Sequence, residues 1–141
     1  FLPNFNTMKP QIDWISLGVS DLNKSLVFYR DGLGFPTDGL VPERPGTVSF
    51  MLDNDQTLVI HEWKGFSMFA ADHNAPLKPS GCIFNCYADS KEDVHAKLDS
   101  AVKAGGKQIG EVADQPWGYV ASVLDPDGHQ WVLFYSPMGK M

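Results

Sequence analysis

Ile15-Ser16-Leu17-Gly18-Val19-Ser20-Asp21 is the stretch that decides the fold, because the chain repeats its pattern at Ile83-Phe84-Asn85-Cys86-Tyr87-Ala88-Asp89. In both places an apolar, β-like run leads directly into an acidic helix start. A polar tight turn follows later in each half, Asp53-Asn54-Asp55-Gln56 and then Asp125-Pro126-Asp127-Gly128. Asp21 therefore aligns with Asp89 and Asp53 with Asp125, and the two offsets are nearly equal. Offsets this similar predict a duplicated structural module.

Each copy predicts the same order of elements, βαβββ. Strands are expected near 11–19, 35–40, 46–52 and 57–63 in the first copy, and near 82–88, 107–112, 119–124 and 130–135 in the second. The first helix starts at Ser20 or Asp21 and the second at Asp89 or Ser90. One helix covers only one face of a four-stranded sheet. The pattern therefore predicts an α+β fold in which two tandem modules form a curved, cup-like mixed sheet with helices on the outside.

The domain boundaries follow from the same pattern. We expect a single domain over residues 10–137, divided into module one (10–63), a linker (64–80) and module two (81–137). The linker is rich in Gly and Pro, and its Phe66, Met68 and Phe69 could form a short helical turn that covers part of the molecule. Residues 1–9 are expected to be a leader outside the fold.

Composition narrows the class of protein. A chain of 141 residues with 43% hydrophobic and 20% charged residues is typical of one globular domain. Its net charge of −6 argues against nucleic acid or an anionic membrane as a partner. Cys82 and Cys86 would lie about 13 Å apart on one strand, too far for a disulfide. Two free thiols favour a reduced, cytoplasmic protein.

The order of several short motifs resembles the vicinal oxygen chelate superfamily, which includes glyoxalase I, extradiol dioxygenases, fosfomycin-modifying enzymes and bleomycin-binding resistance proteins. The matching stretches are Leu17-Gly18-Val19-Ser20-Asp21-Leu22-Asn23-Lys24-Ser25, Phe28-Tyr29, Gly32-Leu33-Gly34-Phe35, Pro116-Trp117-Gly118-Tyr119 and Asp125-Pro126-Asp127-Gly128-His129-Gln130-Trp131. The resemblance implies paired βαβββ modules. It also implies a homodimer, since such proteins often pair two chains through their sheets.

The resemblance also implies where a metal would bind. Family members with a metal hold it with His, Gln or Glu on the first and last strand of each module. Carried onto this chain with the alignments above, those positions are Trp14, Ile60, Cys82 and Val132. Three of these side chains cannot bind a metal, so we predict neither a metal nor another cofactor. A shift in strand register would bring His61 or Glu62 into the set, which keeps a divalent metal as the alternative.

The same positions predict an apolar cup that holds a ligand. Strand alternation adds Phe84 and Phe134 to the inner face, and Trp117 and Tyr119 lie at the entry of a cup-forming strand, where they either contact a ligand or simply pack. Polar or soft groups at the rim are Glu62, Cys82, Cys86 and Gln130. The predicted ligand-binding set is Trp14, Ile60, Glu62, Cys82, Phe84, Trp117, Tyr119, Val132 and Phe134.

The sequence offers few candidates for catalytic residues. Glu62 is the one candidate acid–base group. His61 and Glu62 are neighbours on a strand and face opposite sides, so they are not expected to form a dyad. Asp72-His73 is expected in a solvated loop, His95 on a helix surface and His129 in a turn.

Three functions therefore remain open. The first is a metal-independent protein that binds a small apolar or aromatic molecule. The second is a glyoxalase- or lyase-like enzyme with an atypical or absent metal site. The third is a structural module or one that binds a partner.

Overall fold

The structure is a computed structural model that describes residues 11–53, 55–67 and 81–139. The elements of module one are β1 (Trp14–Val19), α1 (Leu22–Val27), the π-helical turn η1 (Phe28–Gly32), β2 (Thr47–Met51) and β3 (Thr57–Glu62). The short helix α2 (Trp63–Phe66) follows and runs into the predicted linker. Those of module two are β4 (Ile83–Tyr87), α3 (Lys91–Lys103), β5 (Lys107–Gln115), β6 (Gly118–Leu124) and β7 (Gln130–Tyr135). None of the helices in this described part is long and apolar enough to cross a membrane.

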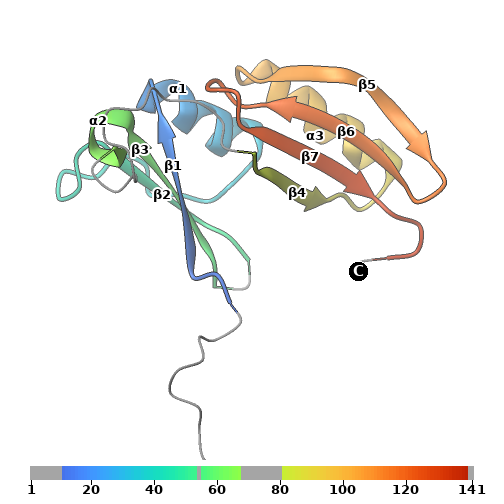
Figure 1. The fold of residues 1–141 in the computed structure, drawn as a ribbon, viewed down its shortest axis with the longest axis horizontal. Helices are drawn as coiled ribbons and strands as arrows, with labels where there is room; N and C mark the ends of the chain where they lie inside the picture. Colours follow the sequence, from blue (N-terminus) through green and yellow to red (C-terminus); the bar gives the residue numbers. More distant parts are fainter. Residues whose placement is uncertain (1–10, 54, 68–80, 140–141) are drawn as a thin grey trace, which may run out of the picture.

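The strands form two separate mixed sheets that stand side by side (Figure 1). The first has the order β1-β3-β2 and the second the order β4-β7-β6-β5. In each sheet the first strand of the module pairs in parallel with the last, and the other pairs are antiparallel. The predicted α+β class is thereby confirmed. The strand expected at 35–40 is reduced to a single bridge between Thr37 and Phe50, so the first sheet has three strands.

Helix capping gives the true alignment of the two copies. The Asp21 carboxylate accepts a hydrogen bond from the backbone N–H of Lys24, which caps α1. In module two the cap is Ser90, whose hydroxyl accepts from the N–H of Asp93. Asp21 is therefore the counterpart of Ser90, the residue that follows Asp89, so the predicted alignment of strand and helix was one position short.

The predicted alignment of the two tight turns is also off by one position. The N–H of Leu52 donates to the carbonyl of Gln56, and the N–H of Asp125 donates to the carbonyl of His129, both at 2.9 Å. Leu52, the residue before Asp53, is thus the counterpart of Asp125, and the last strands align accordingly. Because neighbouring strand residues face opposite sides, each slip moves a predicted residue to the other face of its sheet.

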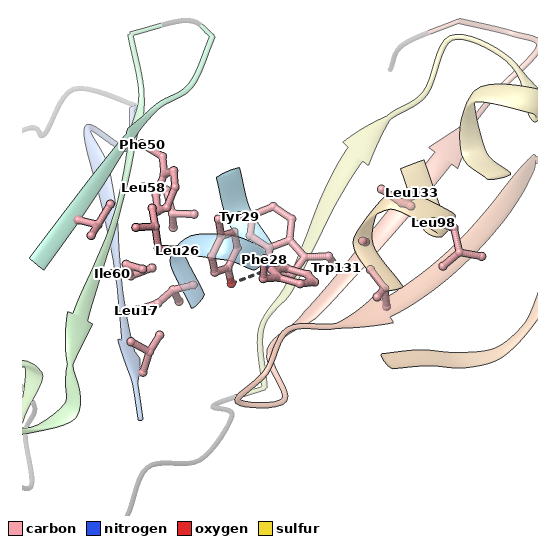
Figure 2. Close-up of a cluster of buried hydrophobic side chains, with 14 of the residues drawn as sticks. Leu17, Leu26, Phe28, Tyr29, Phe50, Leu58, Ile60, Leu98, Trp131 and Leu133 are labelled. Atoms are coloured by element: carbon pink, nitrogen blue, oxygen red, sulfur yellow. Dashed lines mark hydrogen bonds between the residues drawn. The ribbon is translucent and has the colours of Figure 1, made fainter. Parts of the chain in front are cut away.

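The two modules share one hydrophobic core (Figure 2). The first sheet contributes Leu17, Phe50, Leu58 and Ile60, the second contributes Trp131 and Leu133, and α1 and η1 place Leu26, Phe28 and Tyr29 between them. Helix α3 adds Leu98 over the second sheet. We call the face of each sheet that points away from this core its open face. The open faces are where residues remain available for binding.

Candidate functional site

The open face of module two carries a cluster of three aromatic rings. Trp117 lies nearly parallel to Phe134, with 5.8 Å between ring centroids and 19° between planes, and Tyr87 contacts Phe134 on β7 from the neighbouring strand β4. Gly118 makes this possible, because a Cβ there would lie 2.3 Å from the Phe134 ring. The Trp117 side chain remains 60% exposed. The cluster therefore offers a flat, accessible aromatic surface.

The open face of module one has a corresponding cluster that is built differently. The rings of Trp63 and Phe66, both from α2, lie 5.4 Å apart, and Phe66 lies 6.1 Å from the His61 ring of β3. Helix α2 lies directly on Gly18, where a Cβ would be 2.7 Å from each of the two rings. The short helix therefore covers one end of this face.

The two clusters occupy equivalent places in the duplicated modules. Gly18 pairs with His61 in the β1–β3 ladder, and Tyr87 pairs with Phe134 in the β4–β7 ladder. The corrected alignment makes Tyr87 the counterpart of Gly18 and Phe134 the counterpart of His61. Module two fills the site with side chains from its own sheet, whereas module one leaves a glycine there and fills the space with α2.

The corrected alignment also moves two of the four positions at which the resemblance places metal ligands. The counterpart of Trp14 is Ile83 rather than Cys82, and the counterpart of Val132 is Val59 rather than Ile60. The open-face set is therefore Trp14, Val59, Ile83 and Val132. None of these side chains carries an oxygen, nitrogen or sulfur atom with a lone pair for a cation, so the residues present do not fit the family's metal.

Described residues outside these four positions do not form a metal site either. Within the described ranges, no three His, Cys, Asp or Glu side chains gather closely enough to hold a metal ion.

Four of the predicted ligand-binding residues lie on or beside the open faces. Trp14 and Val132 alternate with core residues on β1 and β7, Phe134 follows Val132 on the same side, and Trp117 stacks on Phe134. Trp14 is 64% exposed at the free edge of its sheet. Contact of these residues with a ligand stays a prediction.

Three other residues of the predicted set lie away from the open faces. Ile60 has no exposed surface and packs in the core with Leu17 and Leu58, since the true register puts Val59 and His61 on the open face. Phe84 also faces the core, where its ring lies 4.9 Å from that of Trp131. Tyr119 lies on the helix side of β6, and its hydroxyl is 2.7 Å from Nε2 of His95 on α3.

The predicted polar and soft groups are divided between the two faces. Cys82 is exposed just before β4 begins, and Cys86 faces the core, where burial raises the pKa of its thiol. Both cysteines are free, as predicted. Gln130 lies on the open face at the start of β7, with its amide 3.5 Å from the Ser122 hydroxyl. Glu62 ends β3 and is exposed.

The side chains of His61 and Glu62 line one pocket, although neighbours on a strand face opposite sides. The strand ends at Glu62, and the chain turns there into α2, which brings both residues to the same pocket of about 530 Å³. Thr47 and Lys64 contribute the other polar side chains. Burial lowers the pKa of His61, so its ring is neutral at neutral pH. The residues that line the pocket thus carry an imidazole, a carboxylate, an ammonium and a hydroxyl group.

A buried polar network that the sequence did not reveal connects the modules. The Tyr29 hydroxyl donates to Asp125 Oδ2 at 2.6 Å and accepts from Nε1 of Trp131 at 3.2 Å. Asp125 Oδ2 also lies 2.7 Å from Nδ1 of His129, and Asp125 Oδ1 accepts from the backbone N–H groups of Asp127 and His129. The Asp127 carboxylate in turn accepts from the N–H of Ser20, across the module boundary.

The charges in this network depend on one another. Burial alone would lower the pKa of His129, but the hydrogen bond to Asp125 and the charges of Asp125 and Asp127 outweigh it and raise that pKa. Burial would raise the pKa of Asp125, yet hydrogen bonds from His129 and Tyr29 lower it. His129 is therefore a structural ion-pair partner, and this network holds the β6–β7 turn against α1 and η1.

Comparison with known proteins agrees with this architecture. Residues 11–133 match the family described as Glyoxalase/Bleomycin resistance protein/Dioxygenase superfamily. No curated protein sequence matches the chain.

Solved structures with the same fold come from several bacteria. A glyoxalase-related enzyme from Fulvimarina pelagi is 23% identical, with a TM-score of 0.81 over 92% of this chain and 90% of that one. A hypothetical protein from S. aureus is 25% identical, with a TM-score of 0.77 over 93% and 97%. A lactoylglutathione lyase from Agrobacterium tumefaciens is 21% identical, with a TM-score of 0.66 over 96% and 100%.

The match begins just before β1 and ends within β7, so it spans both modules. The chain therefore belongs to the Glyoxalase/Bleomycin resistance protein/Dioxygenase superfamily.

Proposed function

We propose that this protein binds a small, largely apolar or aromatic molecule on the open faces of its sheets without the help of a metal. The observation that carries this proposal is the stacked pair of Trp117 and Phe134, one ring of which is mostly exposed. Aromatic rings attract flat, apolar ligands and lose little conformational entropy on binding. A monomer that leaves such a surface exposed gains nothing from it in stability.

The surroundings of the stacked pair support an apolar ligand. Val132 lies beside Phe134 on the same face, and Ile83 is 53% exposed at the free edge of that sheet. At the four positions where the family places metal ligands, only apolar side chains are present. These features favour binding through contact area rather than through coordination.

Naphthalene is a suitable probe, because it is flat, apolar and uncharged. We expect it to shift backbone and indole resonances around Trp117 and Phe134 in a two-dimensional NMR titration. Trp117→Ala should weaken this binding about fivefold, the worth of one aromatic contact. Val102→Ala, an exposed apolar position on α3, is the matched control and should leave it unchanged. Equal binding by the wild type and Trp117→Ala would contradict the proposal.

We also propose that the protein acts as a cytoplasmic homodimer. Strands β1 and β4 each form one edge of their sheet. They start with the exposed apolar residues Trp14 and Ile83, which occupy equivalent places in the two modules. A second copy that covers these edges would bring an open face of one chain next to an open face of the other. The cup predicted from sequence would then be formed by two chains.

A glyoxalase- or lyase-like enzyme is the second candidate. The pocket that joins His61 and Glu62 favours it, because a neutral imidazole and a carboxylate suit proton transfer. Elemental analysis of protein purified without chelators tests whether a metal takes part in either candidate. A stoichiometric divalent ion would contradict the metal-independent proposal.

A further inference from the structure

The pocket beside α2 has the size of a ligand site. Its volume of about 530 Å³ lies within the usual range for small-molecule pockets, about 300–1,000 Å³. One wall is the backbone of Pro45 and Gly46, held to β3 by the hydrogen bond from the N–H of Glu62 to the Gly46 carbonyl. Lys64 and Gly65 of α2 also line the pocket, and α2 itself packs on Gly18.

Gly46 keeps this space open. Its φ of +77° favours glycine, and a Cβ there would lie 3.4 Å from Oε2 of Glu62. A side chain at position 46 would therefore be strained and would fill the space next to the Glu62 carboxylate.

The pocket is lined by one acidic and one basic residue. Glu62 is negative, Lys64 is positive, and neither forms an ion pair with any residue that the structure describes. His61 is neutral at neutral pH, with one ring nitrogen that donates and one that accepts. A ligand group with a single charge would be attracted by one of the two ions and repelled by the other. A neutral group that both donates and accepts hydrogen bonds can interact favourably with both.

We propose that this pocket binds the polar end of a ligand through a neutral group that both donates and accepts hydrogen bonds, with a carboxamide as the simplest example. Glu62 accepts from the N–H of that group, and Lys64 or Thr47 donates to its oxygen. The proposal rests on the ligand-binding function proposed above.

Three probes of nearly equal shape test this selectivity, namely benzamide, benzoate and benzylamine. We expect benzamide to shift the amide resonances of Gly46 and Gly65 at concentrations about threefold lower than the other two, the effect of one partly exposed charge. Glu62→Gln should reverse the order in favour of benzoate. Lys64→Gln should reverse it in favour of benzylamine.

Two control variants carry the same changes of charge outside the pocket, Glu111→Gln on β5 and Lys103→Gln on α3, and both should keep the wild-type order. The proposal is wrong if benzoate or benzylamine binds the wild type as tightly as benzamide does, or if neither pocket variant changes the order. Naphthalene, titrated in parallel, reports on Trp117 and Phe134. Loss of naphthalene binding with retained benzamide selectivity would overturn the proposed function but not the assignment of this pocket.

Discussion

Gly18 shows how the absence of one side chain can place a whole element. It lies on the open face of β1, and the rings of Trp63 and Phe66 take the space that a side chain would fill. Its counterpart in module two is Tyr87, whose own ring contacts Phe134. One position of the duplicated module thus holds a helix in one half and an aromatic side chain in the other.

Replacing Gly18 with alanine should displace α2. The added methyl group would come within 2.7 Å of both rings, so we expect a loss of about 1–3 kcal/mol in unfolding free energy. Urea unfolding measures this loss, and stronger quenching of Trp63 fluorescence by acrylamide would report the displaced helix. Gly65→Ala is the matched control, because a Cβ at that position meets no neighbour. Equal stability of the two variants would show that α2 does not depend on Gly18.

The Tyr29 hydroxyl is a second single group on which the stability of the fold depends. Tyr29→Phe removes a donor to the buried Asp125 carboxylate and an acceptor for Trp131. We expect the unfolding free energy to fall by about 1.5–3 kcal/mol, as for hydrogen bonds to charged groups. Tyr135→Phe is the control, because its hydroxyl has no hydrogen bond to a described residue, and its stability should change little. If Tyr29→Phe were as stable as Tyr135→Phe, the proposed role of the network would be contradicted.

At the scale of elements, the β6–β7 turn makes the contact between modules depend on pH. Asp125 and Asp127 raise the pKa of His129, so the stabilisation is complete below the unfolded value of about 6.5 and is lost as pH rises through the raised value. Asp125 has a lowered pKa, so its contribution is present above about 3.8 and is lost as pH falls through the lowered value. The contact should be strongest between these limits.

NMR titration of the ring protons checks this directly. His129 should titrate above about 6.5 and His61, whose pKa burial lowers, below it. His129→Asn keeps a hydrogen-bond donor but has no charge, so its urea midpoint should no longer fall between about pH 6 and pH 9. A wild-type midpoint that stays constant over that range would contradict the ion pair.

The sequence predicts most of these elements because their signals are local. Asp21 caps α1 as its position suggests, and apolar alternation marks β1, β3 and β7. A short helical turn is predicted around Phe66, and α2 ends at that residue, but its start at Trp63 is not predicted, and Met68 and Phe69 lie outside the described residues. Four residues with a central glycine have little helical preference, and packing on Gly18 holds them. The Tyr29–Asp125 contact escapes prediction, because it joins residues 96 positions apart.

At the scale of the whole molecule, the edges of both sheets are the natural place for a second copy. Trp14→Asp and Ile83→Asp would each put a charge on an exposed apolar edge, so we expect either variant to dissociate the proposed dimer. Sedimentation equilibrium should give about twice 15.6 kDa for the wild type and 15.6 kDa for the variants. Val102→Asp, on the outside of α3, should remain a dimer. A monomeric wild type would contradict the proposed assembly.

The candidate site was harder to predict than the fold, and the reason is geometric. The duplication is plain in sequence, but its alignment was one position short in both places, since Asp89 precedes the true cap Ser90 and Asp53 follows Leu52. A slip of one position exchanges the two faces of a strand. Cys82 and Ile60 were therefore placed where Ile83 and Val59 lie. Both alignments leave the family's metal positions without a suitable set of ligands.

The buried polar contact between modules exists on one side only within the described residues. Tyr29 and Asp125 form it, whereas their counterparts under the duplication are Leu98 and Leu52, two apolar residues. A half-length chain that pairs with itself would have every contact twice, by symmetry. Here the copies have diverged into complementary halves, and neither carries both members of the pair. An isolated half would expose its share of the common core and could not regain the Tyr29–Asp125 contact by pairing with itself.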